Sequence, residues 1–248
     1  MFPIRDHNPS GGTPFVTFAL IAANVLAFLA TYVGKSDPEV NLLFWDWGLV
    51  PARIVAEGDY ATALSSMFLH AGWMHLIGNM LFLWIYGDNL EEEMGHAGFL
   101  AFYLVAGLAA AGLQGFADPG STIPMVGASG AIAGVMGGYL LLFPRAKVDV
   151  LFIFLIFFRI FAIPAWIVLG IWFAVQIFSG LATPGDTGGV AYWAHAGGFI
   201  AGLALTLPVW LRRGGGGYWQ ATKGHPPHPP TAFQAARSNV PLVPRRRG

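Results

Sequence analysis

The chain has 248 residues, 55% of them hydrophobic and only 10% charged, and its formal net charge is +0. Because a soluble domain carries about a quarter of its residues charged, this composition excludes an ordinary water-facing surface and predicts an integral membrane protein. The balanced charge gives no sign of a nucleic-acid partner, and the lack of cysteine excludes disulfides and thiolate metal sites.

Six apolar stretches are predicted to span the membrane as helices. A bilayer core of about 30 Å needs roughly 20 apolar residues per helix, and fewer where other helices surround it. The second and fourth stretches are short, which indicates that they are central and begin below one membrane surface. The polar N-terminal segment does not resemble a cleaved signal peptide, so we expect the first stretch to be retained. The predicted spans cover residues 15–33, 74–86, 98–116, 129–143, 163–178 and 194–210.

Two connecting segments have a composition of their own. Residues 34–62 form a loop that is long for a membrane bundle, and Trp45 and Trp47 close to a proline predict a structured segment at the membrane interface. Residues 148–161 have the sequence VDVLFIFLIFFRIF. The charges within this stretch argue against one very long fifth helix, so we expect an interfacial segment or a hairpin there.

The chain is expected to divide into three parts. Residues 1–14 are a cytoplasmic N-terminal segment, residues 15–211 a six-helix domain, and residues 212–248 a cytoplasmic tail rich in Gly, Pro and Arg. The composition of the tail predicts disorder. The excess of Lys and Arg beside the fourth, fifth and sixth spans predicts that both termini are cytoplasmic.

Few polar side chains lie within the predicted spans, and a polar residue inside a membrane indicates function. With six crossings and both termini inside, the second, fourth and sixth helices all run inwards from the outer face. His75 and Asn79, Ser129, and His195 each lie in the first turns of one of these helices. We therefore expect them at one depth, near the outer face, and the i, i+4 spacing puts His75 and Asn79 on one side of their helix.

This set of side chains suits acyl transfer. The hydroxyl of Ser129 is a weak nucleophile that needs a base, and His195 can take its proton. Backbone N–H groups at a helix start, with Asn79 and His75 as side-chain donors, can stabilise the oxyanion that forms. Gly127 permits an unusual turn and a close approach of the substrate backbone. No aspartate is clearly placed to orient the base, so we expect a dyad rather than a triad.

The other glycines of the fourth and sixth spans have a structural explanation. Gly130, Gly134 and Gly138 are four residues apart, as are Gly198 and Gly202. This spacing lets membrane helices approach closely, so we expect these glycines to be packing positions.

Three motifs together resemble the rhomboid family of intramembrane serine proteases, bacterial members included. They are HAGWMHLIGN (70–79), GASGA (127–131) and AHAGG (194–198), and the resemblance covers about residues 15–211. It implies an all-α, six-helix bundle in the cell (cytoplasmic) membrane that hydrolyses peptide bonds within or next to transmembrane segments of other membrane proteins. It implies no cofactor and no metal. The partners it implies for the protein are membrane-protein substrates and the lipid bilayer.

The resemblance implies a role for each candidate residue. Ser129 matches the nucleophile and His195 the base, and Asn79 and His75 match residues that help to hold the oxyanion. Gly127 matches the glycine before the nucleophile, and His70 matches a further histidine with a structural or water-retaining role.

The resemblance extends to the loops, with two departures. Residues 34–62 match the membrane-embedded first loop of the family, and residues 181–193 match a mobile cap over the site. The fifth span matches the helix beside which substrate enters. Ala133 stands where some members carry a tyrosine that stacks on the base, which leaves open how His195 is held. The first loop shows no clear Trp–Arg pair, so Arg53 has no assigned partner.

Two other functions stay open. His70, His75 and His195 are a possible zinc ligand set, although the first two are spaced poorly for one helix face and no carboxylate joins them. A non-catalytic relative that binds membrane helices is the other alternative, but such relatives lack the dyad, whereas both dyad residues are present here. A chelator distinguishes the first alternative from a serine protease.

Overall fold

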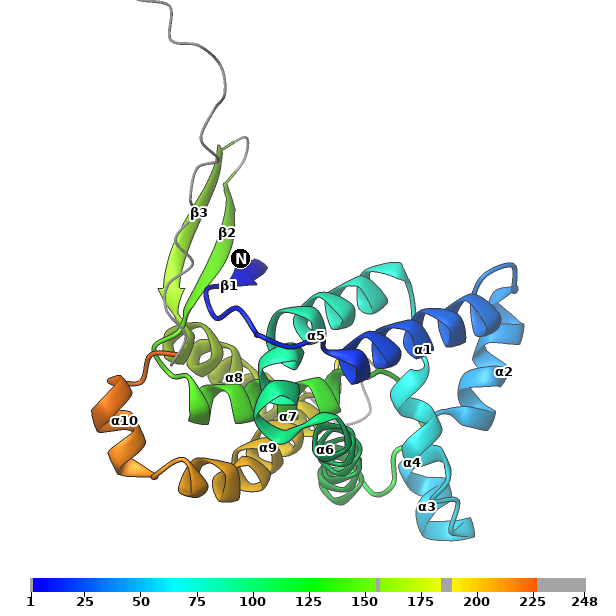
Figure 1. Ribbon diagram of the computed structural model, residues 1–248. Coiled ribbons are helices and arrows are strands. Elements are labelled where there is room, and N and C mark those ends of the chain that lie inside the picture. The colour runs from blue at the N-terminus through cyan, green and yellow to red at the C-terminus, as the bar shows by residue number, and fades with distance from the viewer. Residues whose placement is uncertain (1, 155–156, 184–188, 227–248) are drawn as a thin grey trace, which may run out of the picture.

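The computed structural model describes residues 2–154, 157–183 and 189–226. Helices form at all six predicted positions and pack into a bundle (Figure 1). Within the described residues, α6, α8 and α9 are long and apolar enough to cross a membrane. The helix α5 also passes this test when it is taken together with the preceding segment Thr62–Phe68, which is bent by 93° relative to it. The helices α1 and α7 are apolar but shorter. The six are α1 (Phe15–Thr31), α5 (Trp73–Met94), α6 (His96–Ala117), α7 (Ser129–Leu142), α8 (Ala165–Ala182) and α9 (Tyr192–Arg212).

The second helix is longer than the sequence predicts. The prediction ends it at residue 86, whereas α5 continues to Met94. The carboxylate of Glu91 in this extension accepts hydrogen bonds from the backbone N–H groups of Val16 and Thr17, each at 2.8 Å. N–H groups in the first turn of a helix have no partner within it, so the acidic end of α5 caps α1. Hydropathy alone treats the same acidic residues as the end of the span.

The central helix of the bundle is α7, as its short length predicts. Of its 14 residues, 11 are buried. A Cβ atom added to Gly198 or Gly202 of α9 would overlap the carbonyl oxygen of Gly130 or Gly134 of α7. The two helices are therefore in backbone contact, which confirms that these glycines are packing positions. This contact fixes the first turn of α7 beside the first turn of α9.

The loop over residues 34–62 is structured, as predicted, and it contains a pair that the sequence analysis missed. The guanidinium of Arg53 donates a hydrogen bond to the backbone oxygen of Trp45 and lies 5.6 Å from the centre of its ring. The sequence left Arg53 without an assigned partner because the two residues are eight positions apart and meet only once the loop folds. This end of the bundle consists of α2 (Asp37–Trp47), α3 (Pro51–Glu57), α4 (Thr62–Ser65) and the 3-10 helix η1 (Ser66–Phe68).

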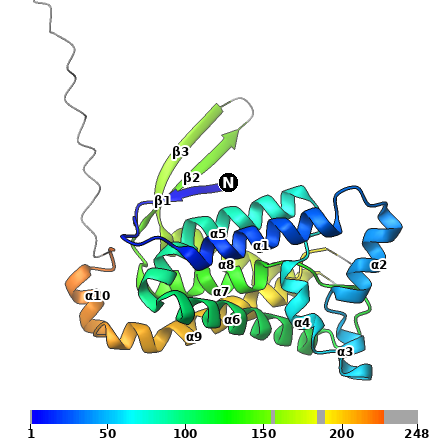
Figure 2. The ribbon, with the colours of Figure 1, turned by 45° about the vertical axis from the view of Figure 1, so that its right-hand side comes forward.

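The expectation of an all-α protein is wrong at the opposite end of the bundle, where an antiparallel sheet projects (Figures 1 and 2). Its strands, in the order β1-β2-β3, are β1 (Phe2–Asp6), β2 (Lys147–Phe154) and β3 (Phe157–Pro164). β2 and β3 form the hairpin that was one of the two expectations for residues 148–161. Aromatic and β-branched residues favour strands, and Val148 and Val150 anchor the base of the hairpin in the core.

The N-terminal segment is tied to the central helix. The hydroxyl of Tyr139 in α7 donates a hydrogen bond to Oδ2 of Asp6 at 2.6 Å. Burial is the main cause that raises the pKa of Asp6 to about 7. The strand β1 therefore brings a half-buried carboxyl group to the end of α7.

The tail expected to be disordered over residues 212–248 begins with structure. Arg212 is the last residue of α9, and Gly216–Thr222 form α10. The indole N–H of Trp219 donates to the backbone oxygen of Leu141 at 3.0 Å, which explains why this part folds against the bundle. Residues 227–248 lie outside the described residues.

Candidate active site

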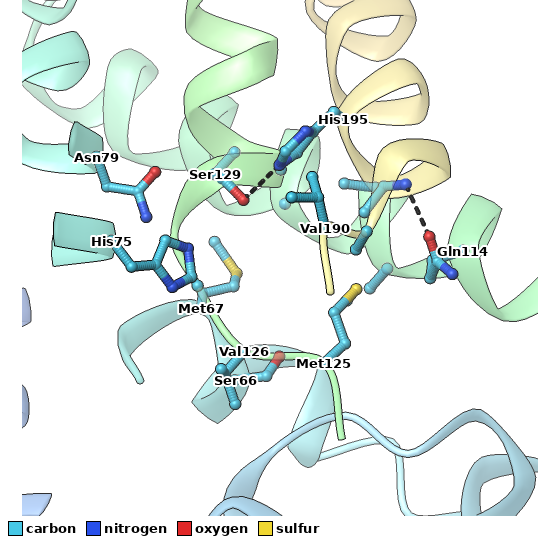
Figure 3. Close-up of a pocket in the computed structure, with 18 of the residues that line it drawn as sticks. Ser66, Met67, His75, Asn79, Gln114, Met125, Val126, Ser129, Val190 and His195 are labelled. Carbon is cyan, nitrogen blue, oxygen red and sulfur yellow. Dashed lines mark hydrogen bonds between the residues drawn. The ribbon is translucent and has the colours of Figure 1, made fainter. Parts of the chain in front are cut away.

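The first turns of α5, α7 and α9 converge on a cavity of about 740 Å³ (Figure 3). His75 and Asn79 reach it from α5, Ser129 from α7 and His195 from α9. The structure therefore brings together the four side chains that the sequence predicts at one depth.

Ser129 and His195 are in direct contact. The Oγ atom of Ser129, the first residue of α7, lies 2.7 Å from Nε2 of His195 (Figure 3). This is hydrogen-bond distance, and the glycine contacts between α7 and α9 hold the two helix starts together. A serine activated by a neighbouring imidazole is a recognised arrangement for nucleophilic catalysis.

The turn before Ser129 depends on Gly127. Its φ of +129° lies where residues with a side chain are strained, and its N–H donates to the backbone oxygen of Ser66 at 2.9 Å. A Cβ atom added to Gly127 would lie 2.8 Å from both Cε1 and Nε2 of His75. Gly127 therefore shapes the turn and leaves the space that the imidazole of His75 occupies.

Asn79 and His75 present donors to the cavity. The Nδ2 atom of Asn79 is buried and has no hydrogen-bond partner among the described residues. The Nδ1 atom of His75 accepts the backbone N–H of Ala71 at 3.4 Å, so the neutral ring carries its proton on Nε2, on the side of the ring that faces Gly127. Together with the N–H groups at the start of α7, which have no partner within the helix, these donors lie at the cavity that Ser129 also lines.

His70 lies behind the cavity rather than in it. Its side chain is fully buried, and its ring contacts that of His75 edge to face, with the centroids 5.1 Å apart. In the part of the chain that the structure describes, no three His, Asp or Glu side chains lie close enough together to hold a metal ion. His70, His75 and His195 are therefore not gathered into a ligand set in this arrangement.

Three further residues contact this site and were missed by the sequence analysis. The Oε1 atom of Gln176 in α8 lies 2.8 Å from Nδ1 of His195, and the ring centroid of Trp172 lies 5.6 Å from that of His195. From α6, Oε1 of Gln114 accepts the N–H of Ala194 at 3.1 Å in the first turn of α9 (Figure 3). A glutamine within an apolar helix is the signal that could have identified Gln176 and Gln114.

The predicted cap over residues 181–193 is described only in part. Val190 and Ala191 line the cavity, so the end of this segment lies at the site. Residues 184–188 lie outside the described residues.

Comparison with known proteins identifies relatives that match between 44% and 79% of this chain. The Rhomboid domain family matches residues 57–212. The chain is 34% identical over 199 residues to "Rhomboid protease GluP" of Bacillus subtilis (strain 168), which is 79% of this chain and 36% of that protein. It is 34% identical over 108 residues to "RHOMBOID-like protein 5" of Arabidopsis thaliana, which is 44% of this chain and 34% of that protein. "Putative rhomboid protease YdcA" of B. subtilis is 33% identical over 132 residues, 51% of this chain and 61% of that protein. The chain thus spans between 34% and 61% of the length of these relatives.

Proposed function

The chain belongs to the rhomboid family, and from that premise we propose that it is an intramembrane serine protease with a Ser129–His195 dyad. Its substrates are membrane proteins, cleaved within or next to their transmembrane segments. The observation that carries the proposal is the 2.7 Å contact between Oγ of Ser129 and Nε2 of His195 at a cavity lined by Asn79 and His75. The relatives named as proteases support it.

In the first half of the reaction, the enzyme is acylated. Oγ of Ser129 attacks the carbonyl carbon of the scissile peptide while its proton moves to Nε2 of His195. The tetrahedral intermediate collapses, the C–N bond breaks, and the imidazolium gives its proton to the leaving amine. The products of this half are an ester on Ser129 and the released C-terminal fragment.

In the second half, water hydrolyses the ester. His195 takes a proton from the water, whose oxygen attacks the ester carbon, and then returns the proton to Oγ of Ser129 as the C–O bond breaks. His70, buried behind His75, has a structural or water-retaining role.

The negative charge of each intermediate needs fixed donors. Three groups supply them: the Nδ2 of Asn79, which has no hydrogen-bond partner in the described part of the chain, the Nε2–H of His75, and the N–H of Ser129 at the helix start. Gly127 holds the turn that brings the last of these to the cavity. Removal of one such donor typically costs about 10²–10³ in kcat.

The multi-pass membrane protein has, in this proposal, six crossings formed by residues 15–211. Residues 1–14 and 212–248 lie in the cytoplasm, and the site opens near the outer face of the cell membrane. Two observations support this orientation: β1 and α10 lie at one end of the bundle and α2 and α3 at the other (Figures 1 and 2), and Lys and Arg cluster beside the fourth to sixth spans. Substrate approaches beside α8, which buries only Ala165, Leu169 and Gln176. The reaction needs no cofactor and no metal.

The test is proteolysis of a single-span membrane protein by the purified chain in detergent. Native protein is compared with Ser129→Ala and His195→Ala, each with and without a chelator. We expect cleavage by the native protein in both conditions and none by either variant. Cleavage by Ser129→Ala contradicts the nucleophile, loss of native activity with chelator supports a metalloenzyme, and inactivity of the native protein on a panel of substrates favours a non-catalytic relative.

A further inference from the structure

The peripheral helix α8 buries one polar side chain. Along its whole length, which the structure describes, the buried residues are Ala165, Leu169 and Gln176. Gln176 is only 6% exposed. Burying an amide in a membrane helix is costly unless both of its ends are hydrogen-bonded, and a leucine would fill the same stripe without that cost. We therefore expect the side chain of Gln176 to have a specific hydrogen-bond partner.

Both ends of the Gln176 amide have one. Its Nε2 donates to the backbone oxygen of Trp172, one turn earlier, at 3.1 Å. This contact determines which end of the amide is the oxygen, and that oxygen lies 2.8 Å from Nδ1 of His195. The partner of the amide oxygen is thus the candidate base itself.

The contact decides where the proton of the neutral imidazole resides. An amide oxygen can only accept a hydrogen bond, so Nδ1 of His195 must carry the proton and donate it to Gln176. The other ring nitrogen, Nε2, is then unprotonated and accepts the hydroxyl of Ser129 at 2.7 Å. In the opposite tautomer, Nδ1 and Oε1 would face each other as two acceptors, and Nε2 could not take a proton.

We propose that Gln176 is a positioning residue of the dyad, which holds His195 in the tautomer able to accept the proton of Ser129. The proposal rests on the proposed function. It also answers how the base is held although Ala133 provides no ring to stack on it. The helix α8 provides the support instead, through the hydrogen bond from His195 to Gln176 and the ring of Trp172 at 5.6 Å.

The hydrogen bond strengthens as the reaction proceeds. When His195 accepts the proton of Ser129, its Nδ1–H becomes part of a cation, and hydrogen bonds from charged donors are roughly twice as strong as neutral ones. An interaction that is stronger in the transition state than in the ground state raises kcat rather than substrate affinity. A purely structural glutamine would leave kcat and the pH profile unchanged.

Two substitutions test this assignment, with one control. Gln176→Leu removes the acceptor and nearly keeps the volume, while Gln176→Glu keeps an acceptor and adds a negative charge beside the imidazole. Val175→Leu, at a half-exposed position of the same helix, controls for a change in α8 that does not reach His195. The readouts are kcat, KM and thermal unfolding for cleavage of a single-span substrate in proteoliposomes across a pH series.

We expect Gln176→Leu to lower kcat by about 10- to 100-fold, as removal of the group that orients a metal-bound histidine does, with little change in KM. Gln176→Glu should retain activity at high pH, with the acidic limb of its profile moved to higher pH, because the carboxylate stabilises the protonated imidazole. Val175→Leu should match the native protein.

The proposal is overturned if Gln176→Leu has the native kcat, or if the profile of Gln176→Glu superimposes on the native one. A lowered unfolding temperature in Gln176→Leu with an unshifted profile in Gln176→Glu also overturns it, because only a structural role then remains. Ser129→Ala in the same assay distinguishes failure of the proposed function from failure of this inference. If Ser129→Ala cleaves, the proposed function fails; if it is inactive and the Gln176 variants behave like native protein, only this inference fails.

Discussion

Replacing Gly127 by alanine should disable the site by moving His75. The added Cβ would lie 2.8 Å from Cε1 and Nε2 of that ring, whereas ordinary van der Waals contact begins at 3.4 Å. The imidazole must therefore retreat by the difference, about 0.6 Å. The φ of +129° adds backbone strain of about 1–3 kcal/mol at a residue with a side chain.

The displacement acts on a group that the mechanism uses as an oxyanion donor. Loss of one such donor costs about 10²–10³ in kcat, and a misplacement of about 1 Å can cost about 10²-fold. We therefore expect Gly127→Ala to lower kcat by about 100-fold. The change in KM should be smaller, because the donor acts mainly in the transition state.

The assay is steady-state cleavage of a single-span substrate, with two comparisons. Gly112→Ala, in α6, adds a Cβ with nothing within 4 Å, so it should keep native activity. His75→Ala and the double variant show whether the effect of Gly127→Ala passes through the ring, because mutations at coupled residues are not additive. Native activity in Gly127→Ala would refute the reasoning. Losses that multiply in the double variant would show that His75 is not the route.

Three further predictions concern stability. Gly202→Val places a side chain against an α7 carbonyl oxygen, so we expect the variant to be unfolded and inactive when thermal unfolding and proteolysis are measured. A stable and active variant would contradict the packing of α7 on α9. Glu91→Ala leaves the N–H groups at the start of α1 without their acceptor and should destabilise the protein by about 1–3 kcal/mol, whereas an unchanged unfolding temperature would contradict this. Burial raises the pKa of Asp6 from 3.8 to about 7. The unfolded chain therefore loses this proton near pH 4 and the folded chain near pH 7. Because the folded state holds the proton more tightly, the free energy of unfolding should fall as the pH rises from about 4 to about 7. Asp6→Asn should flatten that part of the stability profile, and an unaltered profile would contradict the raised pKa of Asp6.

The sequence predicts the helices and the convergence of the candidate side chains because both follow from one constraint. A bilayer requires apolar helices of a set length, and the shared direction of the second, fourth and sixth helices puts His75, Ser129 and His195 at the same end. The glycine spacing likewise predicts the close contact of α7 and α9. These features are local in the sequence or follow directly from the topology.

The features that were missed depend on contacts between distant segments. Gln176 precedes His195 by 19 residues and lies on another helix, so only the packing of α8 on α9 brings them together. The acidic end of α5 continues as a helix because Glu91 finds donors on α1, 74 and 75 residues away in the chain. A hairpin was one of the expectations for residues 148–161, but its third strand was not, because β1 pairs with β2 through residues such as Arg5 and Asp149, which are 144 residues apart in the chain.

The most direct measurement of the central claim is the site of covalent modification by a fluorophosphonate, which reacts with an activated serine. The native protein is labelled in detergent, digested, and the modified residue identified by mass spectrometry, with His195→Ala as the comparison. We predict a single modified residue, Ser129, and loss of labelling in His195→Ala. Labelling at another serine, or labelling of Ser129 that persists at the native rate without His195, would contradict the dyad.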